Sequence, residues 1–136
     1  MSASSPRALF AARLIQARLL RGLSQRTLGD RMGLGKEKGS SRINRYEHQV
    51  TAIGFDNLGL LAQLLDVPVA YLLADDASMA DAILALSQAD DAQREAVGKL
   101  LPALAQDPAL LPKLVKLMEL PKAERPKALR ALSGEN

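Results

Sequence analysis

Apolar residues recur at every third or fourth position along most of the chain, which is the spacing of helices that bury one face. In the front half the pattern stops at Gly22 and again at Gly33, and glycine commonly follows the end of a helix. Ser24 and Pro68 stand where a helix cap and a first helical residue are favoured. These signals predict helices over residues 7–21, 25–32, 58–65 and 68–73.

A short polar segment follows the second expected helix, and it contains a loop and a third of five helices expected in this region. Residues 34–39 hold two glycines and three charged side chains, which predicts a loop. Either Ser40 or Ser41 can then cap a helix that reaches residue 47. Only Ile43 and Tyr46 form an apolar stripe in it, so we expect one narrow edge to be buried and the rest to face outward.

The aspartates at positions 75 and 76 indicate a boundary between two regions, 1–75 and 76–136. Behind it the helical spacing continues, interrupted only by short turns that contain aspartate or proline. The pattern predicts amphipathic helices over residues 79–88, 91–106, 108–120 and 122–132. Their leucine-rich stripes need a surface to pack against.

Composition strengthens the helical interpretation and excludes several functions. Hydrophobic residues make up 48% of the chain but aromatic residues only 3%, so the core must be built mainly from leucine and alanine, both good helix formers. We therefore expect an all-α fold. The chain has no cysteine, which excludes disulfides and thiolate metal sites, and no apolar run approaches membrane-spanning length. We expect a cytoplasmic protein that contacts no membrane.

Charge is divided unevenly along the chain. Residues 1–50 contain ten lysines and arginines but three acids, a balance of +7, whereas residues 51–136 have a balance of −4. A basic front half favours a polyanionic partner. His48 is the only histidine, and the carboxylates are not paired near a nucleophile, so the sequence indicates no enzyme, and we expect no cofactor and no metal.

The front half resembles the phage-repressor and Cro-like helix-turn-helix regulators, the XRE family. The resemblance covers about residues 9–73 and lies in an ordered set of short motifs. These are Arg18, GLSQ at 22–25, Leu28, MGL at 32–34, RINRYE at 42–47 and LAQLLDVPVAYLL at 61–73. It implies a five-helix lambda-repressor-like DNA-binding domain over residues 1–75, followed by a small helical region.

The resemblance also assigns roles to particular residues. The second helix would lie across the DNA backbone, and the third would enter the major groove of double-stranded DNA. The expected base-reading residues are Ser40, Ser41, Asn44 and Arg45, with Arg45 the leading candidate for guanine. The expected phosphate contacts are Gln25, Arg26, Lys36, Lys38 and Arg42. Arg18 and Glu47 would form an internal ion pair that orients the third helix.

Three features depart from the family pattern. The loop before the third helix is longer than usual, Gln49 replaces the glycine that normally follows this helix, and the usual proline near Ile53 is absent. The start of the third helix is therefore open, and a longer front end would move Lys36 or Lys38 onto DNA.

The region after residue 75 suggests how affinity is gained. One recognition helix reads few base pairs, so we expect a homodimer held by C-terminal stripes such as Met79, Ile83 and Leu86, or Leu110, Leu114 and Leu117. Alternatively, these helices complete a monomeric core. The function that the sequence favours is a transcriptional regulator, a repressor, of bacterial or phage origin and associated with the nucleoid. The second hypothesis is an antitoxin or adaptor that binds a partner protein through the C-terminal helices.

Overall fold

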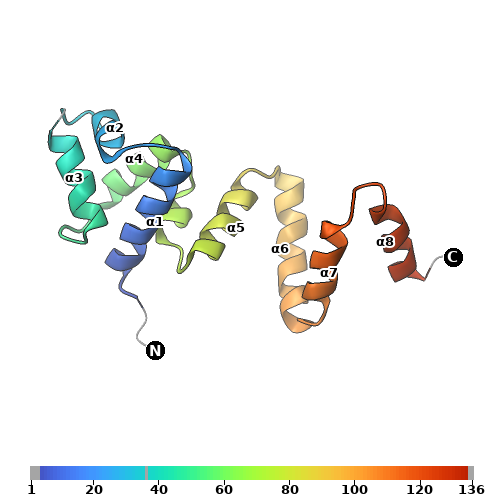
Figure 1. Cartoon of the computed structure of the whole chain (residues 1–136). Helices are drawn as coiled ribbons and strands as arrows, with labels where there is room; N and C mark the ends of the chain where they lie inside the picture. Colours follow the sequence, from blue (N-terminus) through green and yellow to red (C-terminus); the bar gives the residue numbers. More distant parts are fainter. Residues whose placement is uncertain (1–3, 36, 135–136) are drawn as a thin grey trace. The chain divides into compact units, whose positions relative to one another are not determined.

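The computed structural model describes residues 4–35 and 37–134 as helices joined by short loops (Figure 1). The front elements are α1 (Pro6–Leu20), α2 (Gln25–Arg31), α3 (Lys38–Glu47), α4 (Phe55–Leu65) and the 3-10 helix η1 (Val69–Leu73). They are followed by α5 (Ala77–Ser87), α6 (Asp91–Gln106), α7 (Leu110–Glu119) and α8 (Arg125–Ser133). No strand occurs in the described part of the chain, so the all-α prediction is confirmed.

Local chemistry fixes where several of these helices begin. The Ser5 hydroxyl accepts a hydrogen bond from the Ala8 amide, and Pro6 occupies the first position of α1, where no amide hydrogen is needed. Ser24 caps α2 in the same way through the Thr27 amide. At α6, Asp90 and Gln93 form a complete capping box. Polar side chains therefore mark the starts of α1, α2 and α6, whereas α3, α4, α7 and α8 begin without a side-chain cap.

The first four helices and η1 enclose one aliphatic core. Its largest fully buried side chains are those of Leu14, Leu28, Ile43, Leu61, Leu65, Tyr71 and Leu72. The rings of Phe10 and Tyr46 meet edge to face, with centroids 5.8 Å apart and planes at 76°. Burial raises the pKa of the Tyr71 phenol, and nearby Asp81 raises it further.

Two glycines bring α2 and α3 into backbone contact. A Cβ atom on Gly29 would lie 2.3 Å from the Gly39 carbonyl carbon, and one on Gly39 would lie 2.1 Å from the Gly29 carbonyl oxygen. Gly39 therefore belongs to the helix crossing rather than to a loop. This contact explains why α3 begins at Lys38, earlier than the expected start at Ser40 or Ser41, and why the loop expected over 34–39 is shorter. Lys36 lies outside the described residues.

The chain divides into two compact units, an N-terminal unit (Met1–Ala89) and a C-terminal unit (Asp90–Asn136). The boundary expected between residues 75 and 76 falls inside the first of these. Helix α5 packs on η1 and α1 because Ala80 is fully buried there, and the Gln16 side chain donates to Asp81 at 3.1 Å. The N-terminal unit thus includes one helix more than the motif region.

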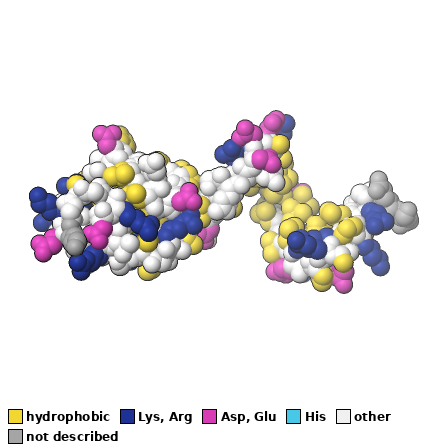
Figure 2. All heavy atoms as spheres, turned by 90° about the horizontal axis from the view of Figure 1, so that it is seen from above, with side chains coloured by type: hydrophobic (Ala, Val, Ile, Leu, Met, Phe, Trp, Pro, Cys, Tyr) yellow, Lys and Arg dark blue, Asp and Glu magenta, His cyan; other side chains and the backbone are white. Residues whose placement is uncertain are grey.

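The C-terminal unit contains α6, α7 and α8, with contacts between α7 and α8. Leu117 is its only buried hydrophobic residue among those described. On the face seen in Figure 2, hydrophobic side chains gather over these helices. No described helix is both long enough and apolar enough to cross a bilayer.

Candidate nucleic-acid interface

Helix α3 is seated by one apolar edge and exposes the opposite one. Ile43 is fully buried and Tyr46 is 4% exposed, because α3 packs against α1 and α2 along this edge. The Tyr46 hydroxyl also accepts a hydrogen bond from the Asn57 side chain at 3.4 Å, which links α3 to α4. On the outer side Ser41, Arg42, Asn44 and Arg45 are exposed. Helix α3 is therefore held by its apolar edge and presents a polar side to solvent.

Two grooves run along the sides of α3. The α4 groove, about 730 Å³, lies between Arg42 and Arg45 of α3 and the residues Thr51, Gly54 and Asn57. The α2 groove, about 460 Å³, lies between Gln25 and Arg26 of α2 and Ser40 and Asn44 of α3. Glu37 and Ser41 line both grooves, so they mark the crest that separates them.

The cations at this surface lie along the two grooves. Arg26, Lys38, Arg42 and Arg45 are exposed and line the grooves. Arg21, which directly follows α1, instead donates to the Leu65 carbonyl at 2.8 Å and to the Asp66 carbonyl at 2.7 Å, at the end of α4. Residues 51–89 carry five acids and no lysine or arginine. The positive charge open to a polyanion is therefore concentrated on α2 and α3.

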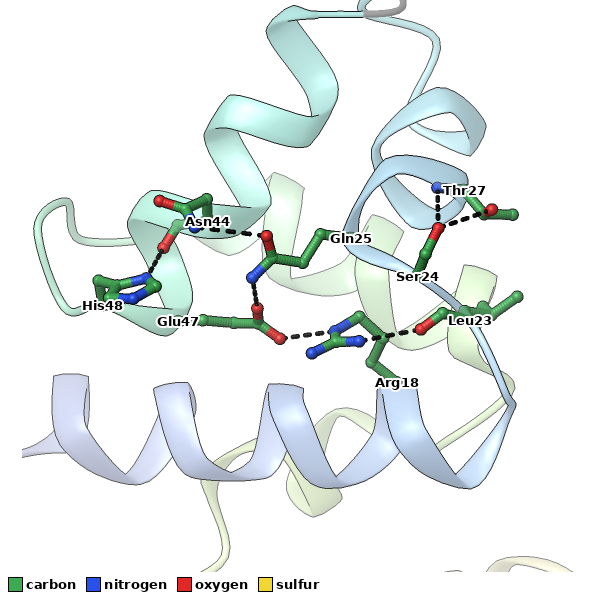
Figure 3. A network of polar contacts seen from close by, with 8 residues as sticks. All are labelled: Arg18, Leu23, Ser24, Gln25, Thr27, Asn44, Glu47 and His48. Atoms are coloured by element: carbon green, nitrogen blue, oxygen red, sulfur yellow. Dashed lines mark hydrogen bonds and ion pairs between the residues drawn. The ribbon is translucent and has the colours of Figure 1, made fainter.

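A hydrogen-bonded network ties the end of α3 to α1 and α2 (Figure 3). The expected ion pair is present: Arg18 Nε donates to Glu47 Oε1 at 2.7 Å, and the Glu47 side chain is 2% exposed. Arg18 also donates to the Leu23 carbonyl at 3.0 Å, in the turn before α2. The side-chain amide of Gln25 donates through Nε2 to the second carboxylate oxygen of Glu47, Oε2. Both oxygens of a buried carboxylate are thus satisfied, which is what its burial requires.

The network continues to the exposed face. Asn44 Nδ2 donates to Gln25 Oε1 at 3.3 Å, so the chain of contacts runs from Arg18 through Glu47 and Gln25 to a residue on the outer side of α3. Gln25 was expected as a phosphate contact, and it lies at the first position of α2 beside the α2 groove. Here its side chain holds α2 and α3 together.

The remaining residues singled out from the sequence fall in different places. Ser40 is half-buried and faces only the α2 groove, whereas Ser41 stands on the crest. Lys38 is the first residue of α3. Sequence reasoning missed Glu37, Thr51 and Asn57, which line the α4 groove. The open start of α3 was the one signal that could have drawn attention to Glu37.

His48 plays a local part. Its Nδ1 lies 2.8 Å from the Asn44 carbonyl oxygen at the end of α3. Within the described residues no group of three or more histidines and carboxylates could hold a metal ion.

Comparison with known proteins gives two findings. A family model described as helix-turn-helix matches residues 14–72. The crystal structure of the transcriptional regulator BswR superposes with a TM-score of 0.62 at 30% sequence identity, covering 71% of this chain and 96% of that one. No curated protein matches in sequence.

Proposed function

The chain belongs to the XRE-type helix-turn-helix family and is a DNA-binding transcription regulator, and from this we propose that it is a homodimeric repressor that reads a specific DNA sequence with α3. The observation that carries the proposal is the exposed crest of α3 between two grooves lined by cations. A helix fits the major groove of B-DNA, about 12 Å wide, with a phosphate backbone on either side. The outer side of α3, with its crest, would meet the bases, and cations along the two grooves would meet the phosphates on either side.

Base reading is assigned to the outer side of α3. Arg45 is exposed and can donate two hydrogen bonds to the acceptors of guanine, and Asn44 has the donor and acceptor that match adenine. Ser41 on the crest and Ser40 in the α2 groove complete the set. For Asn44 this means exchanging its contact with Gln25, a neutral hydrogen bond at 3.3 Å, for one with a base.

Phosphate contacts are assigned to the groove walls. Arg26, which lines the α2 groove, and the first backbone amides of α2 would serve one phosphate backbone, and Lys38 and Arg42, which line the α4 groove, would serve the other. Gln25 retains one amide hydrogen beyond the bond to Glu47 and would donate it to a phosphate. Lys36 lies outside the described residues and is assigned here from the sequence alone.

Dimerisation is assigned to the C-terminal unit. On α7, Leu111, Val115 and Met118 follow one another at helical spacing and are 44%, 56% and 60% exposed. Of the α7 stripe expected from the sequence, Leu117 is buried and Leu114 half-buried, whereas Leu110 is 40% exposed. A contiguous apolar stripe in water is unfavourable, and a second copy of the chain would cover it with twofold symmetry. Sedimentation at micromolar concentration tests this, and a strictly monomeric particle would contradict it and favour the partner-protein hypothesis.

Selection from a random duplex library with the full chain tests the DNA-binding proposal. We expect a two-part palindromic site whose halves lie about one helical turn apart. Arg45→Ala should reduce the preference at one base pair of each half-site by about tenfold, whereas Arg26→Ala should weaken binding to all sequences alike. Equal losses on every sequence for both variants would exclude base reading by Arg45. A promoter reporter carrying the selected site then tests repression, since a bound repressor lowers expression.

A further inference from the structure

Glu37 lies at the front of the candidate interface, in a position that the sequence pattern did not indicate. It directly precedes α3, and its carbonyl accepts the Ser41 amide hydrogen at 3.1 Å, so these two residues are one helical turn apart. Both residues line the α4 groove and the α2 groove. The crest of α3 therefore extends one turn beyond the first expected base-reading residue, and it ends in a carboxylate.

This carboxylate has no structural task in the described part of the chain. Glu37 stands at the cap position of α3, but its side chain makes no capping hydrogen bond. It is exposed, and no ion pair between described residues includes it.

A carboxylate at this place opposes general attraction to DNA. The surrounding side chains Arg26, Lys38 and Arg42 favour phosphates, whereas Glu37 repels them. Its cost would be offset where a hydrogen-bond donor of a base meets it. In the major groove only the amino groups of cytosine and adenine are donors, and adenine presents an acceptor beside its amino group that repels the second carboxylate oxygen.

We propose that Glu37 is a specificity-determining residue that accepts a hydrogen bond from the amino group of a cytosine at one position of each half-site. The inference rests on the proposed function, since it requires α3 to enter the major groove. Guanine and thymine present acceptors on the corresponding edge, so the carboxylate disfavours both. Glu37 thus acts by rejecting wrong bases as much as by binding the right one.

Glu37→Gln tests the inference because it keeps the shape of the side chain and removes its charge. The full chain and the variant are each used to select duplexes from the same random library, and binding is then measured on the selected site and on its three substitutions at each position. We expect the variant to lose about tenfold of the preference for cytosine at one position and to shift toward adenine, whose edge suits an amide. Preferences at the other positions should stay unchanged.

Asp30→Asn is the matched control, since it removes one negative charge from an exposed residue of α2 that lines neither groove. It should leave every base preference as in the parent chain. If Glu37→Gln changes binding only as Asp30→Asn does, equally on all sequences, the inference is overturned while the proposed function stands. If the parent chain itself prefers no sequence, the proposed function fails and the inference fails with it. Thermal melting of both variants checks that the fold is retained.

Discussion

The two units of the chain bury their hydrophobic residues to very different degrees. In the N-terminal unit seven large side chains are fully buried, whereas in the described part of the C-terminal unit only Leu117 counts as buried, at 9% exposure. Eight large hydrophobic residues of α6, α7 and α8 are at least 40% exposed. The N-terminal unit thus has a well-buried core, while the C-terminal unit leaves exposed the apolar side chains on which the proposed dimer contact rests.

Charge follows the same division. The exposed cations of the interface lie on α2 and α3, and residues 90–136 carry eight bases against seven acids, close to balance. The negative balance noted in the second half of the sequence comes from residues 51–89, which belong to the N-terminal unit. Recognition of a polyanion and association of chains are therefore assigned to separate parts of the protein.

Truncating a leucine in each unit tests the comparison with the largest expected effect. Leu61 is fully buried in the core. Leu61→Ala should therefore lower the free energy of unfolding by about 3–4 kcal/mol, because apolar burial is lost and a cavity is left. Leu101 is 52% exposed, and Leu101→Ala should cost less than about 1 kcal/mol at low protein concentration. Urea denaturation of the full chain measures both variants. Equal losses in the free energy of unfolding would refute the difference in burial between the two units.

Ion pairs give a second contrast between the units. Arg18→Met leaves the buried Glu47 carboxylate with Gln25 as its remaining side-chain donor, and should cost about 2–3 kcal/mol. The value is below that of a fully buried pair because the Arg18 side chain is 15% exposed. In the C-terminal unit Lys99 pairs with Glu95 at 2.9 Å, but both are more than two-thirds exposed, so Lys99→Met should cost only about 0.3 kcal/mol.

The same urea experiment decides this second comparison. Replacing both partners in Arg18→Met/Glu47→Leu should restore part of the stability, because no buried charge is then left without its partner. A double variant no more stable than Arg18→Met would show that the pair itself, rather than the stranded carboxylate, carries the energy.

Association should respond to changes in the C-terminal unit alone. Val115→Asp and Met118→Asp place charges on the exposed stripe of α7, and together they should raise the dimer dissociation constant by about a hundredfold, since desolvating a carboxylate opposes burial. Leu19→Asp is the matched control on α1, at 64% exposure, and should leave the constant unchanged. Sedimentation equilibrium measures all three. If Leu19→Asp causes dissociation, the dimer contact lies in the N-terminal unit and the proposed assignment to α7 is wrong.

Most of the fold followed from periodicity and caps. Ser24 and Pro68 directly precede α2 and η1, and Gly22 follows the end of α1 by two residues, so each marks a boundary through local chemistry. The start of α3 did not follow, because it depends on Gly29 meeting Gly39 across a helix crossing. A glycine pair of this kind resembles a loop signal in the sequence, and only the packed structure distinguishes the two.

The interface was predictable where it depends on helical spacing and not where it depends on loops. Ile43 and Tyr46 gave the buried edge of α3, and therefore the exposed side that carries Arg42 and Arg45. Thr51 reaches the α4 groove from the turn after α3, and Asn57 reaches it from the start of α4, and no periodicity describes the path of the turn that places them both. The Gln25 contact with Glu47 joins side chains distant in sequence, and no local signal reports it.

The turn after α3 gives the prediction with the smallest expected effect. Gln49 has φ of 61°, a left-handed conformation that costs a residue with a side chain about 1–2 kcal/mol and glycine almost nothing. Because glycine also loses more chain entropy on folding, Gln49→Gly should stabilise the N-terminal unit by about 0.5–1 kcal/mol. Gln88, which ends α5 with φ of −86°, is the matched control, and Gln88→Gly should destabilise by about the same amount. If urea denaturation gives both glycines the same sign, the left-handed conformation of Gln49 does not lower the stability of the N-terminal unit.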